Sequence, residues 1–240
     1  MHLERAPRGF SLVELAVVLV IIGFLMVSGI LAFNAQVDSR NFEENARRLT
    51  LASEMVLAFA IANRRLPCPA TAGTTGVEAP SGGGTCTTSF NGFLPAETIG
   101  YPYYDSDRYA LDAYGNRIRY AVASAITGCT GTSTTPHFTS VNNLRANGMT
   151  CQPNDLDICT TAACAARVVA ERTAVFLVLS TGKNGALTSS YVTDESENTD
   201  GDMTFVSRTP GGGSDTFDDQ LLVVPVGVLY SRLSTAGVLP

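Results

Sequence analysis

The chain has 240 residues, a formal net charge of −6, 45% hydrophobic residues and only 16% charged residues. This length allows one domain with an appendage and a sizeable core, and the composition excludes intrinsic disorder, which requires low hydrophobicity and high charge. The negative balance also argues against a nucleic-acid partner, since binding a phosphate backbone requires a concentrated basic patch.

The first predicted element is an apolar helix near the N-terminus. No charged residue occurs between Glu14 and Asp38, which leaves 23 uncharged positions. As a helix these positions extend about 35 Å, which is enough to cross a hydrocarbon core of about 30 Å. Because Arg5 and Arg8 precede this segment, we expect the N-terminus to stay in the cytoplasm and the chain beyond the helix to lie in the periplasm.

The junction between the leader and this helix has an unusual order. The residues around Gly9 read R-G-F-S-L-V-E, so a short polar leader meets the apolar helix at Gly9–Phe10. A secretory signal would carry its apolar stretch before the cleavage site and lose it on processing. Glu14 lies at the start of the helix, where an unpaired carboxylate near hydrocarbon is unfavourable. After a cut behind Gly9, the new α-amine of Phe10 would lie one turn from Glu14, or could meet Glu14 of a neighbouring chain.

This pattern resembles the processing and assembly motif of type IV pilins and of the pseudopilins of type II secretion systems. The resemblance covers residues 8–14 and the apolar run that follows. It implies that a prepilin peptidase cuts after Gly9 and methylates the amine of Phe10, and that Glu14 aligns subunits during filament assembly. One departure is Leu31, which stands where many relatives carry a helix-kinking proline. The alternative is a plain signal-anchor helix with an accidental glutamate.

Past the membrane segment the helix is predicted to continue, because apolar or small residues recur at spacings of three and four from Phe42 to Ala60. Pro67 follows and ends it. We therefore expect one helix of roughly 84 Å from Phe10 to about Arg65, with a transmembrane half and an amphipathic half. The resemblance implies an α+β, pilin-like fold in which this long N-terminal helix packs on a small antiparallel sheet.

The predicted organisation has four parts. Residues 1–9 form a prepilin leader, 10–37 the transmembrane half of the helix, 38–66 its periplasmic half, and 67–240 a globular pilin-like head. Strands are expected in the head at Ile118–Val122, at Val175–Leu179 as a central strand, near Tyr191, at Met203–Val206 and in F-D-D-Q-L-L-V-V-P, before a short helix in V-G-V-L-Y-S-R-L.

The stretch D-A-Y-G-N-R-I-R-Y contains a turn signal at Tyr114-Gly115-Asn116. It is similar to the D-x-W-G-N-x-x-x-Y stretch of pseudopilins, with Tyr114 in the place of the tryptophan. We expect its role to be structural.

Six cysteines lie in loops rich in Thr, Gly and Pro, and an even count there favours disulfides in an oxidising compartment. They are Cys68, Cys86, Cys129, Cys151, Cys159 and Cys164. Cys68 with Cys86 and Cys159 with Cys164 are plausible local pairs, but the sequence does not choose among the fifteen possible pairings. Residues 127–167 carry four of the cysteines and are expected to form a disulfide-stapled insertion. The alternative is six buried thiols.

Residues 194–219 hold eight acidic groups against Arg208 alone. Clustered oxygen ligands on a flexible loop are what calcium requires. Major pseudopilins bind calcium in a comparable C-terminal loop, although Lys183-Asn184 stands here where their glycine turn often carries an acidic residue. The alternative is a solvated acidic loop, and no other cofactor is expected. The predicted calcium ligands are Asp194, Glu197, Asp200 and Asp202.

Catalysis is not expected, because removal of the leader takes His2 and leaves His137 as the only histidine, and no phosphate-cradling loop or dinucleotide fingerprint occurs. With the resemblance, the sequence predicts a pseudopilin of a type II secretion pseudopilus, anchored in the inner membrane by one span and extracted into the filament. Its expected partners are prepilin peptidase, other pilin or pseudopilin subunits, an inner-membrane assembly platform and the lipid bilayer. The alternatives are a major or minor type IV pilus subunit for adhesion or DNA uptake, and a signal-anchored periplasmic binding module.

Overall fold

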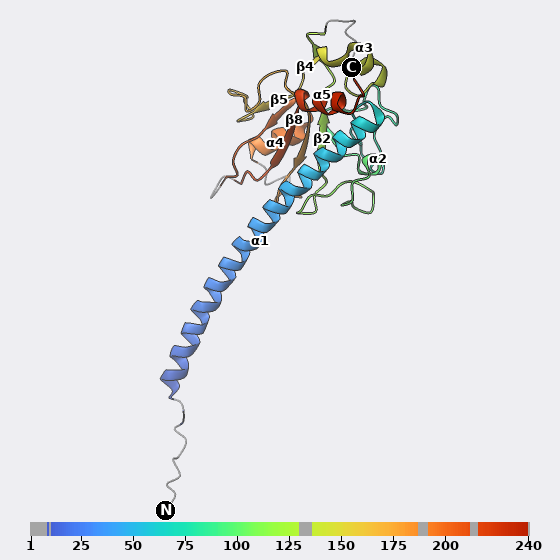
Figure 1. Cartoon of the computed structure of the whole chain (residues 1–240). Coiled ribbons are helices and arrows are strands. Elements are labelled where there is room, and N and C mark those ends of the chain that lie inside the picture. The colour runs from blue at the N-terminus through green and yellow to red at the C-terminus, as the bar shows by residue number, and fades with distance from the viewer. Residues whose placement is uncertain (1–8, 10, 130–135, 187–191, 212–215, 240) are drawn as a thin grey trace, which may run out of the picture. The chain divides into compact units, whose positions relative to one another are not determined.

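The computed structural model describes residues 9, 11–129, 136–186, 192–211 and 216–239, with the backbone alone at residues 27–35 (Figure 1). The chain divides into two compact units, Met1–Glu43 and Glu44–Pro240. The expected strand near Tyr191 lies outside the described residues. The architecture is α+β, with a long N-terminal helix and a small antiparallel sheet.

The first unit contains the N-terminal part of α1, the helix Leu12–Asn63. The side chains from Leu12 to Met26 are exposed, and most of them are large and apolar. Where the structure describes side chains, no helix is both long enough and apolar enough to cross a membrane. The expected span at residues 10–37 includes Phe10 and residues 27–35, whose side chains lie outside this description, and it stays a prediction.

Four strands form the main sheet of the second unit, in the order β1-β2-β6-β8. Their bounds are Gly92–Phe93, Arg119–Val122, Ala174–Ser180 and Gln220–Pro225. Every neighbouring pair is antiparallel, and Phe176 of β6 lies opposite Val122 of β2 and Val224 of β8. All seven residues of β6 are buried, which confirms the central position that the continuous β-favouring run Val175–Leu179 predicts.

The second part of α1 supplies one wall of the core. Its buried side chains recur at spacings of three and four: Leu49, Ala52, Val56 and Ala60. They belong to the same hydrophobic cluster as Tyr120 of β2 and Phe176 of β6. From Leu49 onward the pattern therefore buries the helix against the sheet, as expected. Phe42, where the predicted pattern begins, is instead 41% exposed. The helix ends at Asn63, and Arg64 follows with a φ of 58°.

The turn in D-A-Y-G-N is tied to the end of β6 by one buried carboxylate and one amide side chain. Asp112 is 1% exposed. Its Oδ1 accepts hydrogen bonds from the N–H groups of Tyr114 and Asn116 at 2.9 and 2.8 Å, and its Oδ2 accepts one from Oγ of Ser180 at 2.6 Å. Asn116 in turn donates its Nδ2 to the carbonyl oxygen of Gly182 at 2.6 Å. The motif thus joins the turn before β2 to the turn after β6.

Shorter elements surround the main sheet. The helices are α2 (Ala96–Ile99), α3 (Val141–Asn147), η1 (Gly148–Thr150), α4 (Thr193–Asp200) and α5 (Val226–Thr235). The strands β3 (Ile126–Thr127) and β4 (Gln152–Pro153) pair antiparallel, whereas β5 (Asp157–Cys159) and β7 (Thr204–Val206) pair parallel. The β5–β7 pairing ties the cysteine-rich segment to the acidic region that follows α4.

The six cysteines form three disulfides, Cys68–Cys86, Cys129–Cys151 and Cys159–Cys164. The first and third are the local pairs that the spacing favours. The second joins residues on either side of α3 and η1, so the segment expected as a stapled insertion carries two of the three bonds.

The expectation of a flexible loop over residues 194–219 is wrong for much of that segment, because it contains α4 and β7. The helix begins where the carboxylate of Glu195 accepts a hydrogen bond from the N–H of Val192 at 3.0 Å. It ends at Asp200, and the capping residue Gly201 follows with a φ of 95°, a conformation that suits glycine. Asn198 then binds the backbone of Val206 through both its amide nitrogen and its amide oxygen, at 3.1 and 2.7 Å. These contacts order the segment.

Candidate functional site

The predicted cleavage position lies just before α1. Gly9 is exposed and belongs to no helix or strand, and an added Cβ would meet nothing within 4 Å. Phe10, the residue expected to carry the methylated amine, lies outside the described residues. The described flank on the other side is Ser11, which precedes the first helical residue. An exposed, irregular segment of this kind is the usual substrate of a peptidase.

Glu14 lies in the first turn of α1. Ser11 caps this turn, since its Oγ accepts a hydrogen bond from the N–H of Val13 at 3.4 Å. A carboxylate in the first turn interacts favourably with the positive end of the helix dipole. The side chain of Glu14 is exposed, and it has neither an ion pair nor a hydrogen bond among the described residues. No residue in the described part of the chain therefore neutralises the charge of this carboxylate.

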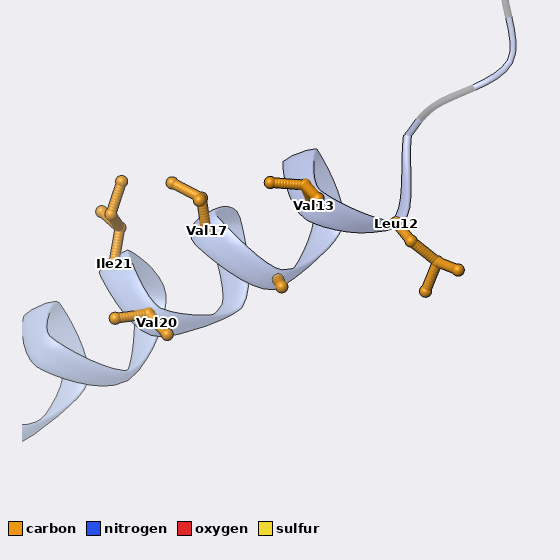
Figure 2. A pocket seen from close by; sticks show the side chains of 6 residues that line it. Leu12, Val13, Val17, Val20 and Ile21 are labelled. Carbon is orange, nitrogen blue, oxygen red and sulfur yellow. The ribbon is translucent and has the colours of Figure 1, made fainter.

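The same helical turns present an apolar surface. Val13, Val17 and Ile21 project from the same side of the helix, one turn apart (Figure 2). Together with three neighbours they line an open, almost wholly apolar hollow formed by Leu12, Val13, Ala16, Val17, Val20 and Ile21. A face of this kind requires lipid or another apolar helix to cover it. The exposed carboxylate and the exposed apolar face thus occupy the same few turns.

Three of the four predicted calcium ligands lie close together. Carboxylate oxygens of Glu197, Asp200 and Asp202 lie within 4.8 Å of one another, and we call this group the Glu197 cluster. Burial, followed by the charges of Asp200 and Asp202, raises the pKa of Glu197. Oδ1 of Asp200 accepts a hydrogen bond from the N–H of Asp202 at 3.0 Å, and Oδ1 of Asp202 accepts one from the N–H of Thr204 at 2.6 Å.

The fourth predicted ligand does not join that cluster. Oδ2 of Asp194 lies 2.8 Å from Nε of Arg208, and its Oδ1 accepts a hydrogen bond from the N–H of Ala162 at 2.9 Å. Its carboxylate therefore already has a cationic partner and a backbone donor.

A second carboxylate group is more deeply buried, and its members are not among the ligands predicted from the sequence. It consists of Glu195, Asp218 and Asp219, again with oxygens within 4.8 Å of one another, and we call it the Glu195 cluster. Glu195 is 0% exposed and Asp219 is 4% exposed. Burial, with added repulsion from the charges of Glu195 and Asp218, raises the pKa of Asp219 to about 7.

The Glu195 cluster leaves oxygen atoms without donors. Oε1 of Glu195 accepts hydrogen bonds from Nδ2 of Asn184 and from the N–H of Asp218, at 3.0 and 3.1 Å, and Oδ2 of Asp219 accepts one from Asn198 at 2.7 Å. Among the described residues, the buried Oδ1 atoms of Asn184, Asp218 and Asp219 have no hydrogen-bond partner. The signal in the sequence was the pair Asp218-Asp219 directly before a strand, since alternation directs one of two such neighbours inward.

Comparison with known proteins identifies one segment of the chain. Residues 5–30 match the family model of the prokaryotic N-terminal methylation motif. No curated protein and no solved structure matches the chain. The matched segment includes Gly9, Phe10, Glu14 and the residues that line the apolar hollow. It includes neither the cysteines nor the two carboxylate clusters, so those features rest on the geometry of the second unit.

Proposed function

We propose that this chain, which its N-terminal methylation motif identifies as a type IV pilin-like or pseudopilin subunit, is a structural subunit of a type II secretion pseudopilus. The observation that carries the proposal is Glu14, an exposed carboxylate with no partner among the described residues, in the same helical turns as an exposed apolar face. Such a carboxylate needs a positive partner once lipid or another helix covers that face. The amine that cleavage creates at Phe10 supplies this charge, in the same chain or in its neighbour.

The motif implies processing by prepilin peptidase and assembly with other pilin subunits. We extend this to an inner-membrane assembly platform and the lipid bilayer as further partners, with one membrane span, a cytoplasmic N-terminus and a periplasmic head. The three disulfides support the periplasmic side for the head, because disulfides persist in oxidising compartments.

The preference for a pseudopilus over a type IV pilus comes from the head. The D-A-Y-G-N turn resembles the corresponding stretch of pseudopilins, and Asp112 ties it to the end of β6. The acidic region after β6 also resembles that branch, and it gathers carboxylates into two clusters. These features support the pseudopilin assignment.

As part of this function we propose that the head binds calcium at the Glu195 cluster. Calcium takes six to eight oxygen ligands from carboxylates, amide carbonyls and water. The buried, unpartnered Oδ1 atoms of Asn184, Asp218 and Asp219 fit this chemistry, and the charge of the ion would remove the repulsion between the three carboxylates. The Glu197 cluster fits less well, since Asp200 and Asp202 are exposed and already accept backbone hydrogen bonds.

Mass spectrometry of the protein extracted from membranes tests the processing step. We expect a chain that starts at N-methylated Phe10. We also expect Gly9→Leu to block the cut, because a bulky side chain would then stand on the residue just before the cleaved bond, where glycine has none. A chain with an intact leader, or one cut beyond residue 30, would contradict the proposal.

The assembly role of Glu14 is tested by expressing Glu14→Ala together with a tagged wild-type subunit. The amount of each subunit is then measured in filaments sheared from the cells. Insertion and cleavage should be unchanged, whereas incorporation of the variant should fall. Glu43→Ala is the matched control, because Glu43 is also an exposed glutamate of α1 with no ion pair among the described residues. Equal incorporation of both variants would remove the role assigned to Glu14.

Deletion of the gene in its native host separates the two kinds of filament. Loss of type II secretion with normal surface pili is the expected result. Normal secretion together with loss of pilus-dependent adhesion or DNA uptake would instead assign the chain to a type IV pilus.

A further inference from the structure

A small pocket lies where three segments that are distant in the sequence meet. These segments are the end of α1, the helix α3 and the residues that follow α5, and Figure 1 shows α3 and the end of α1 near the C-terminal end of the chain. The pocket has a volume of about 180 Å³. Its lining residues are Arg64, Val141, Arg145, Gly237, Val238 and Leu239. Two of its six lining residues are therefore arginines.

Neither arginine has an acidic partner among the residues that the structure describes. Seven arginines of the described residues lie within 3.4 Å of a carboxylate oxygen, namely Arg48, Arg65, Arg108, Arg117, Arg167, Arg208 and Arg232. The side chains of Arg64 and Arg145, both exposed, form no ion pair, hydrogen bond or ring contact in the described part of the chain. In a chain with more acidic than basic residues, two unpaired guanidinium groups on one pocket are a concentrated positive charge.

The backbone at Arg64 adds to this observation. Arg64 has a φ of 58° directly after the last residue of α1, and this left-handed position at a helix end is usually occupied by glycine. An arginine there strains the backbone. Each arginine also lies at the negative end of a helix dipole, because Arg64 follows α1 and Arg145 lies in the last turn of α3. That attraction acts on each arginine separately and does not by itself explain why both line one pocket, where their like charges repel each other across partly exposed space.

We propose that this pocket binds a small oxyanion, a phosphate or a carboxylate group, through the guanidinium groups of Arg64 and Arg145. A planar guanidinium offers paired N–H donors that match the oxygens of both groups. The volume suffices for a group of several heavy atoms, because a cavity of roughly 10–15 Å³ on the same measure already holds a water molecule. This site is independent of the carboxylate clusters and of the N-terminal motif.

The proposal is tested by the melting temperature of the processed full-length protein in detergent, at pH 7 and with a chelator present. Near-ultraviolet circular dichroism of the tyrosines monitors the unfolding. Sodium phosphate and sodium acetate are compared with sodium chloride at equal ionic strength. Phosphate should raise the melting temperature by several degrees more than chloride does. A matching rise with acetate identifies a carboxylate as a sufficient ligand, and a rise with phosphate alone assigns the site to phosphate.

Arg64→Gln and Arg145→Gln should each abolish the phosphate effect. Arg172→Gln is the matched control and should keep it, because Arg172 is likewise exposed with a φ of 62° and lies outside the pocket. An equal phosphate effect in all three variants, or no effect beyond that of chloride, would overturn the proposal.

A second measurement guards against misfolding of the Arg64 variant. In the protein without substitutions, phosphate should shift the ¹⁵N resonance of the Arg145 guanidinium. This resonance is assigned as the one that is missing from the spectrum of Arg145→Gln. An unshifted resonance at saturating phosphate would also overturn the proposal.

Discussion

Arg65 and Glu78 form a two-pronged ion pair in the interior of the second unit. Nη1 of Arg65 lies 2.7 Å from Oε2 of Glu78, and its Nη2 contacts Oε1. Each residue is 6% exposed. The same Oε2 accepts a hydrogen bond from the N–H of Cys68 at 3.0 Å. The pair therefore links the end of α1 to the loop that the Cys68–Cys86 disulfide closes.

Removing one member of this pair should be strongly destabilising, because it leaves a buried charge without its partner. Arg65→Met is expected to lower the free energy of unfolding by about 3–5 kcal/mol, and Arg65→Met with Glu78→Leu should lower it much less. Chemical unfolding followed by the tyrosine signal measures both. Glu54→Gln is the control, since it breaks the exposed Arg232–Glu54 pair and should cost no more than about 1 kcal/mol. If Arg65→Met lowered the free energy of unfolding as little as Glu54→Gln does, the prediction would be contradicted.

The disulfides should differ in their contribution to stability according to the length of the chain they close. Replacing both cysteines by alanine is expected to cost about 3 kcal/mol at Cys68–Cys86 and about 2 kcal/mol at Cys159–Cys164, because the second bond closes a much shorter loop. The same unfolding assay measures the difference. Alkylation of the native, unreduced protein should label no cysteine, and six reactive thiols would refute the pairing.

The protein should lose stability in mild acid through His137. The ring is fully buried, its Nε2 lies 3.4 Å from the hydroxyl of Tyr230, and burial lowers the pKa of His137 to about 4. The unfolded chain has a histidine pKa near 6.5. The neutral ring therefore contributes stability that is fully present above about pH 6.5 and is lost as the pH falls toward about 4, by roughly 3 kcal/mol.

His137→Phe checks this acid dependence, because phenylalanine keeps a ring against Phe138 and cannot be protonated. The difference in unfolding free energy between the two proteins should change between pH 7 and pH 4, with the wild type losing more. Buried carboxylates such as Asp112 and Asp155, whose pKa values burial raises, titrate in both proteins and cancel in the comparison. Parallel pH profiles would show that His137 is not responsible.

Calcium should stabilise the head through the Glu195 cluster. Binding to the folded state alone contributes about 2.7 kcal/mol at a hundredfold excess over the dissociation constant. Asp219→Asn should therefore reduce the rise in melting temperature that millimolar calcium produces over chelator, whereas Asp202→Asn should leave it intact. Magnesium should substitute poorly, because it prefers a rigid octahedral shell.

The reverse pattern of these two variants would place the ion at the Glu197 cluster, which contains three of the four ligands predicted from the sequence. Identical melting curves in calcium and in chelator would show that neither cluster binds calcium, and would leave the pilin-like assignment untouched.

Local patterns carried most of what the sequence determined by itself. The motif around Gly9 and Glu14 lies within a few consecutive residues, and the later part of the periodic pattern, from Leu49 to Ala60, encodes the buried face of α1. The run Val175–Leu179 was identifiable as the central strand because every residue in it is apolar. Each of these features depends on neighbours in the chain, whose geometry the helix or strand period sets.

Only the tertiary structure decided which distant residues meet. The Cys129–Cys151 bond and the parallel pairing of β5 with β7 join segments whose own sequences do not specify their partners. Glu195 meets Asp218 and Asp219 across more than twenty residues, while its neighbour Asp194 turns to Arg208. Charge composition located the acidic region but could not divide it into clusters, because contacts between side chains there follow from the packing of α4 against β7 and from the entry of the chain into β8.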